Sequence, residues 1–238
     1  MCEIHNANCF DILPKIKDHS VDLFILDLPY NQTACTWDKE IIDLNLLWKH
    51  LKRIGKHKTC YIFLTTTKFG HKVIESNKAW FRYDLVYEKT VALGFFHANQ
   101  MPLRSHEMIY VFYKKLPTFN PQKTPGIPYY KSSANTTNIY TKHCARLPTK
   151  CEDGSRYPKS VLKFSNGNYK SKHPCSKPIK LMEYLIKSYS NENDLVCDPF
   201  MGVGSSMIAC KNNNRNYIGI ELDYAFFKIV EEKKYESP

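Results

Sequence analysis

The sequence predicts an α/β protein in which a basic insertion interrupts a sheet of strands that alternate with helices. Short apolar runs alternate with helical patterns in residues 1–115 and again in residues 173–238, whereas residues 116–172 are rich in Pro, Asn, Ser, Thr, Tyr and Lys. The chain carries a net charge of +11, and its excess positive charge falls mainly in that middle stretch. We therefore expect residues 1–115 and 173–238 to be two halves of one domain around the insertion.

In the first half, strands are expected where apolar runs are short and continuous. The run from Val21 to Leu28 is typical of a buried strand. Further strands are expected at residues 60–64, 81–89 and 108–113. A helix is expected between the strand at residues 21–28 and the strand at residues 60–64. The residues that suit its apolar face are Ile41, Ile42, Leu46, Leu47 and Leu51.

The second half resumes the same alternation. A helix is predicted where apolar residues recur at the helical spacing, at Met182, Leu185, Ile186 and Tyr189. Strands are expected at residues 195–197 and 217–220, with a helix from about Ser205 between them and a last helix to about Lys234. The insertion contains one convincing strand, residues 161–164, and long segments with so little regular structure are usually functional or disordered.

Composition excludes several classes of protein. At 238 residues and 43% hydrophobic content the chain can bury the core of one large domain without disulfide or metal support. No run approaches the ~18 apolar residues of a membrane span, and the N-terminus lacks the features of a signal peptide, so we expect an intracellular protein without a membrane partner. The nine cysteines are widely spaced, so we expect reduced, packed thiols and no metal site.

The positive charge is concentrated in one stretch. Residues 114–180 contain 14 lysines and arginines against Glu152 and Asp153 only, a net +12, which leaves −1 for the rest of the chain. Aromatic residues are interleaved with these cations, and that combination favours nucleic acid, because cations contact phosphates and rings stack on bases. The alternative is a solvated lysine-rich loop region whose charge only aids solubility.

A glycine turn predicts a nucleoside site. The segment Asp198-Pro199-Phe200-Met201-Gly202-Val203-Gly204-Ser205 follows one predicted strand and opens a helix. Two glycines allow a tight turn and close approach of a ligand to the backbone, at the strand end where open α/β sheets bind ligands. Glu221 ends the next strand, where a carboxylate can accept both hydroxyls of a ribose.

Four residues at the end of the first buried strand suit methylation of a base amino group. That nitrogen shares its lone pair with the ring, so it must become more tetrahedral before it can attack a methyl sulfonium. The carboxylate of Asp27 and a backbone carbonyl fixed by Pro29 would accept its two hydrogens. Tyr30 would stack on a base that has left the duplex. An ordinary strand-end turn is the alternative.

Together these motifs make the chain similar to the beta-class DNA amino-methyltransferases, which methylate adenine N6 or cytosine N4. In that family a catalytic D-P-P-Y motif precedes the target-recognition region, and the cofactor motif D-P-F-x-G-x-G-[ST] follows it. The chain resembles this order through Asp27-Leu28-Pro29-Tyr30 and the segment from Asp198 to Ser205. Additional resemblances are His173-Pro174-Cys175-Ser176-Lys177-Pro178, Asn8-Cys9-Phe10-Asp11-Ile12-Leu13 and Arg104-Ser105-His106-Glu107. Leu28 and Asn8 depart from the family's proline and acidic residue.

The resemblance implies a Rossmann-like, mixed and mostly parallel sheet with helices on both faces. It also implies S-adenosylmethionine as cofactor, residues 1–115 as the catalytic half, residues 116–172 as the target-recognition insertion and residues 173–238 as the cofactor-binding half. Catalysis would rest on Asp27, Pro29 and Tyr30. Cofactor contacts would come from Asn8, Cys9, Phe10, Asp27, His173, Lys177, Asp198, Phe200, Gly202, Gly204, Ser205 and Glu221. Candidate DNA contacts are Arg104, Lys131, Arg146, Lys150, Arg156 and Lys159.

We therefore expect a DNA adenine-N6 methyltransferase that flips its target base out of the duplex. Asp27 favours adenine, because family members that act on cytosine often carry serine at that position, but cytosine N4 stays open. An RNA or protein amide methyltransferase and an inactive DNA-binding relative are weaker alternatives. The expected partner is double-stranded DNA, and the sequence leaves open a homodimer and a cognate restriction endonuclease.

Overall fold

The computed structural model describes residues 1–29, 42–131, 149–166 and 176–234. The chain divides into two compact units. The large unit combines residues 1–120 with 160–238, and the small unit is residues 121–159.

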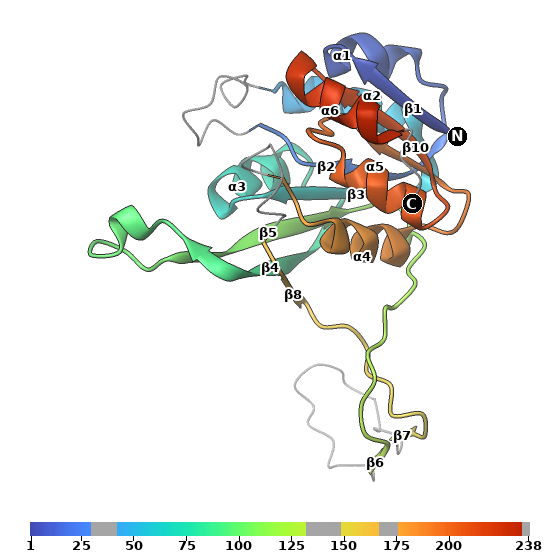
Figure 1. Ribbon diagram of the computed structural model, residues 1–238. Helices are drawn as coiled ribbons and strands as arrows, with labels where there is room; N and C mark the ends of the chain where they lie inside the picture. The colour runs from blue at the N-terminus through green and yellow to red at the C-terminus, as the bar shows by residue number, and fades with distance from the viewer. Residues whose placement is uncertain (30–41, 132–148, 167–175, 235–238) are drawn as a thin grey trace. The chain divides into compact units, whose positions relative to one another are not determined.

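An eight-stranded sheet forms the centre of the large unit, with the strand order β1-β10-β9-β2-β3-β5-β4-β8 (Figure 1). Its strands are β1 (Cys2–Asn6), β2 (Val21–Leu26), β3 (Gly55–Thr65), β4 (Phe81–Leu93), β5 (Arg104–Phe112), β8 (Val161–Phe164), β9 (Leu195–Asp198) and β10 (Asn216–Glu221). Strand β5 is antiparallel to both neighbours, whereas the other paired strands of this sheet are parallel. The predicted mixed, mostly parallel sheet is therefore confirmed.

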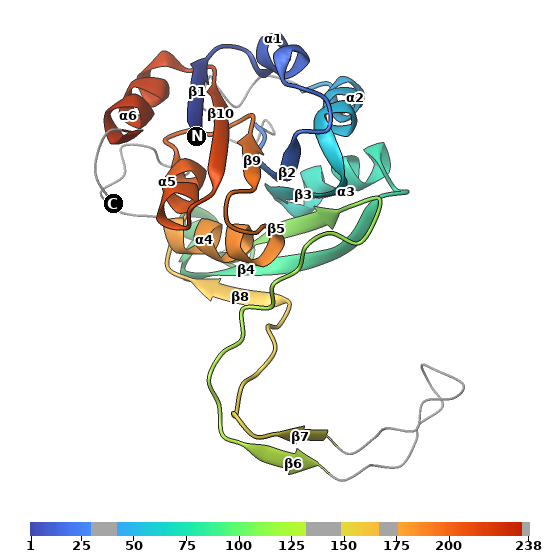
Figure 2. The same ribbon diagram turned by 90° about the vertical axis from the view of Figure 1, so that its right-hand side faces the viewer.

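Helices cover both faces of this sheet (Figure 2). Those of the large unit are α1 (Cys9–Ile12), η1 (Leu13–Lys15), α2 (Leu44–Ile54), α3 (Thr67–Ser76), η3 (Phe95–His97), α4 (Ile179–Tyr189), α5 (Ser205–Asn212) and α6 (Tyr224–Lys234). One core cluster joins Leu23, Ile25 and Ile62 to residues of α4, α5 and α6. The other joins Phe24 and Phe63 to α1, α2 and α3. Alternate residues of β2 thus face opposite helix layers, which is why this strand is a continuous apolar run.

The predicted strands and helices occur close to their expected positions, but some elements gave no clear signal. Strand β1 is an edge strand that pairs only with β10, and its five residues alternate polar with apolar ones too briefly to stand out. Helix α3 buries only Gly70 and Val73. A side chain at Gly70 would clash with the Tyr110 ring, so this glycine is required by packing rather than by a turn.

The small unit contains the short antiparallel strands β6 (Tyr129–Lys131) and β7 (Thr149–Cys151). An isolated bridge pairs Thr124 with Arg156. Strand β8 was expected to lie in the insertion of residues 116–172, but it pairs with β4 in the large sheet.

Hydrogen bonds hold Asn120, the last residue of the large unit before the small unit begins. Asn120 donates its backbone N–H to Ser188 O at 2.7 Å and its side-chain amide to Ser190 O at 3.0 Å, both at the end of α4. Directly after the small unit, Ser160 O accepts a hydrogen bond from the backbone N–H of Val86 at 2.8 Å. The residues on both sides of the small unit are therefore held by hydrogen bonds within the large unit.

Trp48 is a residue of α2 whose ring packs in the aromatic part of the core. Its side chain is 2% exposed, contacts the rings of Tyr61, Phe63 and Phe112, and donates its indole N–H to Ser76 Oγ at 2.9 Å. We predict that Trp48→Ala lowers the free energy of unfolding by about 3–5 kcal/mol, the range for deleting a buried aromatic ring. Leu46→Ala, at an exposed position of the same helix, should cost less than about 1 kcal/mol. Urea titration measures both, and equal losses would contradict this role for Trp48.

Candidate functional site

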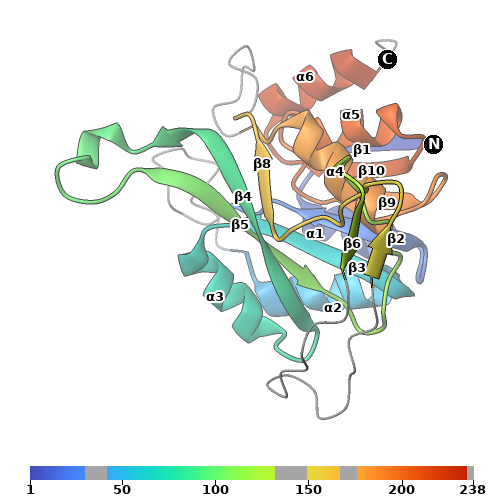
Figure 3. The ribbon, with the colours of Figure 1, turned by 90° about the horizontal axis from the view of Figure 1, so that it is seen from below.

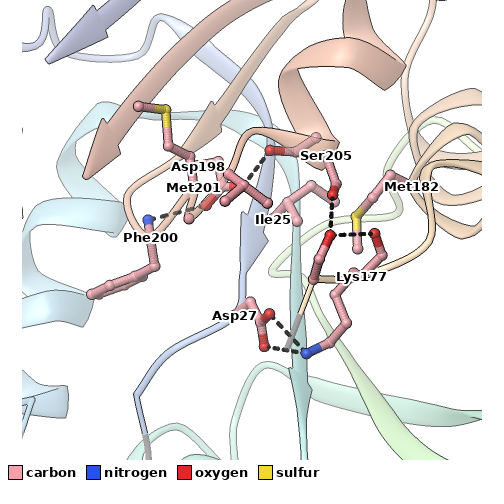
Figure 4. A pocket seen from close by; sticks show the side chains of 12 residues that line it. Ile25, Asp27, Lys177, Met182, Asp198, Phe200, Met201 and Ser205 are labelled. Atoms are coloured by element: carbon pink, nitrogen blue, oxygen red, sulfur yellow. Dashed lines mark hydrogen bonds and ion pairs between the residues drawn. The ribbon is translucent and has the colours of Figure 1, made fainter. Parts of the chain in front are cut away.

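Asp27 lies at the carboxyl edge of the sheet, directly after β2. Its carboxylate is paired with Lys177, whose Nζ is 2.9 Å from Oδ1 and 2.8 Å from Oδ2 (Figure 4). Lys177 lies just before α4 and is 9% exposed. Residues from the two halves of the chain, far apart in sequence, are thus joined at one strand end.

The ion pair continues into a longer row of charges. Lys177 Nζ is also 3.4 Å from Glu107 Oε2, and the Oε1 atom of Glu107 is 2.5 Å from Lys89 Nζ. Asp27, Lys177, Glu107 and Lys89, which we call the charge row, therefore alternate in sign. The side chains of Lys177, Glu107 and Lys89 are at most 13% exposed. Buried charges are tolerated when each has a partner of opposite sign, and this row meets that condition.

Burial and the neighbouring lysines shift the pKa values of Asp27 and Glu107 in opposite directions. Burial raises the pKa of Asp27, and the nearby Lys177 ammonium only partly offsets this effect. Burial would also raise the pKa of Glu107, but the two lysines beside it outweigh burial and hold its pKa below the ordinary value. Glu107 is therefore the firmly ionised anion of the row, and Asp27 is the carboxylate whose charge responds to what lies next to it.

The glycine turn has the backbone geometry that the sequence predicted. Gly202 and Gly204 have φ angles of +54° and +79°, in the left-handed region where side chains are strained. A Cβ at Gly204 would also lie 3.0 Å from a methyl group of Val230. Among the residues that the structure describes, none would lie within 4 Å of a Cβ at Gly202, so the backbone there faces space that a ligand can approach. Gly204 is the N-cap of α5, so this helix begins at the turn.

Two carboxylates lie on either side of this turn, at the ends of neighbouring strands. Asp198 ends β9, is 3% exposed, and accepts hydrogen bonds from the Phe200 N–H at 3.0 Å and the Ser206 hydroxyl at 2.5 Å. Burial raises the pKa of Asp198 to about 7. Glu221 ends β10 and accepts the N–H groups of Gly202 and Asp223, each at 2.8 Å. Burial raises the pKa of Glu221 as well.

A pocket connects the glycine turn to the charge row (Figure 4). It holds about 380 Å³ of space, counting its open mouth. The predicted residues among its lining are Asp27, Lys177, Asp198, Phe200, Gly202 and Ser205. The structure therefore brings these six residues from both halves of the chain around one cavity.

The N-terminal residues with predicted cofactor contacts lie beside Glu221. Strands β1 and β10 pair in parallel with Asn6 opposite Glu221, and Asn8, Cys9 and Phe10 follow at the start of α1. Asn8 caps this helix, because its side-chain oxygen accepts the Phe10 N–H at 2.9 Å. That oxygen, which we expected to accept a hydrogen bond from a cofactor amino group, thus already has a partner in the chain.

The candidate DNA contacts fall in different parts of the chain. Lys131, Lys150 and Lys159 are exposed residues of the small unit, and Arg104 is exposed on β5. Arg156 has an internal structural role. Its guanidinium donates to the carbonyls of Gly154 and Ile127 and lies 4.6 Å from the centre of the Tyr129 ring.

Three predicted residues, Tyr30, Arg146 and His173, lie outside the described residues. Pro29 is half-buried and follows Asp27 and Leu28 after the end of β2. Sequence reasoning missed the part that Lys89 and Glu107 play at this site, although Glu107 stands in a segment that carried the resemblance. The local pattern gave no signal for them, because β4 and β5 also carry Arg82, Asp84, Glu88 and Arg104, and only the pairing of the two strands brings Lys89 beside Glu107.

Neither a metal-binding group nor a membrane-spanning helix occurs in the described ranges of the chain. Within them, no group of three or more His, Cys, Asp or Glu side chains is arranged to hold a metal ion. No helix in the same ranges is long and apolar enough to cross a membrane.

Comparison with known proteins assigns this site to a class. Residues 21–232 match the family model of the N6/N4 methyltransferases, described as DNA methylase. Type II methyltransferase M1.MboII of Moraxella bovis is 30% identical over 244 residues, which cover 93% of this chain and 92% of that protein. The crystal structure of the M1.HpyAVI–SAM complex superposes with a TM-score of 0.68 at 23% identity, covering 98% of this chain and all of the other. PvuII DNA methyltransferase (cytosine-N4-specific) gives a TM-score of 0.73 at 13% identity, with 99% and 87% coverage.

The fold is that of two solved methyltransferases, on which the chain superposes over nearly its whole length. The chain belongs to the N6/N4 DNA methylase family, because the family model spans most of its length and M1.MboII matches nearly end to end. The family resemblance carried by the sequence motifs is therefore confirmed.

The charge row predicts a large effect from loss of its central lysine. Lys177→Met leaves Asp27 and Glu107 as neighbouring buried anions, so we expect a loss of about 3–5 kcal/mol in the free energy of unfolding at pH 7. Lys163→Met removes an exposed ion pair with Glu88 and should cost no more than about 1 kcal/mol. Urea titrations of both variants test the difference. Similar small losses would mean that the row is solvated rather than buried.

Proposed function

We propose that this DNA methylase transfers a methyl group from S-adenosylmethionine to the N6 amino group of adenine, at a specific site and on a base flipped out of the duplex. The observation that carries this proposal is the position of Asp27, a carboxylate at the strand end that lines the pocket and pairs with Lys177. Family membership supports the DNA substrate and the cofactor.

S-adenosylmethionine supplies an electrophilic methyl group on a sulfonium. The pocket fits such a molecule in its chemistry, because it combines an open glycine backbone with the buried carboxylate of Asp198. Glu221, at the end of the neighbouring strand, accepts a hydrogen bond from Gly202 of the pocket lining. Asp198 would hold the cationic amino group of the methionine end, and Glu221 would accept the ribose hydroxyls. Phe200, Gly202, Gly204 and Ser205 would line the cleft, and Asn8, Cys9 and Phe10 would border the adenine. His173 would help Lys177 to close the site.

Asp27 would activate the target nitrogen. Its carboxylate accepts one amino hydrogen, the carbonyl fixed by Pro29 accepts the other, and Tyr30 stacks on the base. Lys177 holds Asp27 ionised before the base arrives. An amino group that approaches Asp27 competes with Lys177 for the carboxylate oxygens. The Oε2 atom of Glu107, 3.4 Å from Lys177 Nζ, offers the displaced ammonium a second anion.

Adenine is preferred over cytosine because the first residue of the catalytic motif is an aspartate. The superposition on the cytosine-N4-specific PvuII enzyme at 13% identity concerns the fold alone and does not decide the base. Cytosine N4 is the second candidate. RNA, protein amides and an inactive DNA-binding role rank lower, because this chain belongs to a DNA methylase family.

We assign target recognition to residues 116–172, the basic stretch that contains the small unit. Lys131, Arg146, Lys150 and Lys159 are its candidate phosphate or base contacts, together with Arg104 on β5. Arg156 is better explained as the residue that holds the small unit together. A homodimer and a cognate restriction endonuclease stay expectations.

The test is methylation of mixed-sequence DNA in vitro, followed by mapping of modified bases by single-molecule sequencing. We expect N6-methyladenine at one short site of ~4–6 base pairs. Asp27→Ala should abolish transfer while S-adenosylmethionine binding stays near normal, because the carboxylate acts on the base. Modified cytosine would select the second candidate, and substantial turnover by Asp27→Ala would remove Asp27 from catalysis.

The assignment of Glu221 predicts a separate effect on the cofactor. Glu221→Ala should weaken S-adenosylmethionine binding by ~1.5–3 kcal/mol, the range for losing hydrogen bonds to a charged group. Glu231→Ala, which changes an exposed residue of α6, should leave affinity unchanged. Calorimetry measures both. An unaltered affinity in the Glu221 variant would exclude a ribose contact.

A further inference from the structure

Strands β4 and β5 extend beyond the rest of the sheet at the edge where Asp27 lies. The last pair between β3 and β5 joins Thr65 to Met108, one strand away from the end of β2. Beyond that pair, β4 and β5 continue as a hairpin that projects from the large unit (Figures 1 and 3). The hairpin therefore stands on the same side of the sheet as the charge row and the glycine turn.

The tip of this hairpin, residues 93–103, presents apolar side chains to solvent. Phe96 is 99% exposed and Phe95 is 80% exposed, and Leu93, Met101 and Leu103 around them are also exposed. Gly94 has a φ of +92° and allows the turn that presents both phenylalanines. A cluster of exposed large apolar residues on a projecting element indicates a binding surface, because such clusters are uncommon on free monomers.

The tip of the hairpin carries no acidic residue. Between Glu88 and Glu107 the sequence contains no Asp or Glu, and Arg104 is exposed on β5. Exposed apolar rings with a cation, in a segment without acidic residues, suit a polyanion with stacked aromatic groups, which is the chemistry of duplex DNA.

Hydrogen bonds and ion pairs fix the base of the hairpin to the catalytic edge. Asn166 donates to Val91 O at 2.8 Å and accepts the Val91 N–H at 3.0 Å, so the segment after β8 holds β4. Lys89 on β4 and Glu107 on β5 are the last two members of the charge row. A hairpin held at its base presents its tip at a fixed position relative to Asp27.

We propose that residues 93–103 bind duplex DNA beside the target base, with Phe95 and Phe96 as a wedge that enters the base stack. This inference rests on the proposed function, since a DNA methylase must place its target base near Asp27. Removing a base from the stack costs a few kcal/mol and leaves a gap that apolar side chains can fill. The wedge would stabilise the flipped state and lower that cost.

The experiment compares the double variant Phe95→Ala/Phe96→Ala with Leu46→Ala. Leu46 is exposed on α2, outside the proposed target-recognition stretch, so it controls for loss of an exposed apolar side chain. The probe is a duplex that carries the site mapped for the wild-type enzyme, with 2-aminopurine at the target position. Binding is followed by fluorescence anisotropy and flipping by 2-aminopurine emission.

We expect the double variant to bind this duplex about tenfold or more weakly, as for the loss of one aromatic–base stack, and to lose most of the flipping signal. Leu46→Ala should behave as wild type. A mismatch opposite the target, which makes unstacking cheaper, should restore most of the lost signal.

Three outcomes would overturn the proposal. The first is a double variant that matches Leu46→Ala in affinity and flipping. The second is an equal loss on matched and mismatched duplexes, which would indicate a contact unrelated to unstacking. The third is a sedimentation shift from dimer to monomer with unchanged DNA binding, which would assign the tip to a second copy of the chain. If the wild-type enzyme methylates no DNA at all, the proposed function fails instead.

Discussion

The buried row of alternating charges, Asp27, Lys177, Glu107 and Lys89, is the constraint on which the arrangement of the site depends. Each ion needs its neighbour, because an unpaired charge at these depths would cost several kcal/mol. The four residues come from the end of β2, the segment before α4, β5 and β4. The row therefore fixes the approach of the two halves of the chain, and it does so at the edge where the glycine turn opens the pocket.

Charge balance and chemistry impose opposite demands at Asp27. The ion pair with Lys177 stabilises the Asp27 carboxylate, but it also occupies the oxygens that would accept a hydrogen bond from the base. To act on an amino group, Asp27 must therefore release Lys177. Because Glu107 keeps its charge and lies beside Lys177, the ammonium can change partners without becoming unpaired. The proposed catalytic residue thus lies in a pair that is strong enough to organise the resting site and can still be opened by a substrate.

Much of the fold and half of the pocket could be predicted from the sequence. Strand β2 and helix α4 were recognisable because burial imposes a period on apolar residues, and Gly202 and Gly204 because left-handed backbone demands glycine. Lys89 and Glu107 could not be placed, since their role depends on the antiparallel pairing of β4 with β5, which no local pattern encodes. The internal role of Arg156 was missed for a related reason: a cation that binds carbonyls looks the same in sequence as one that binds phosphate.

The inserted small unit leaves and rejoins the large unit at two anchored points, Asn120 with the end of α4 and Ser160 with Val86. Neither anchor uses a side chain of residues 121–159. Under the proposal that this insertion reads the target, it is a replaceable segment, because its length and sequence can change without disturbing either anchor. Exchange of the segment would then create a new target site at no cost to the packing of the sheet that carries Asp27.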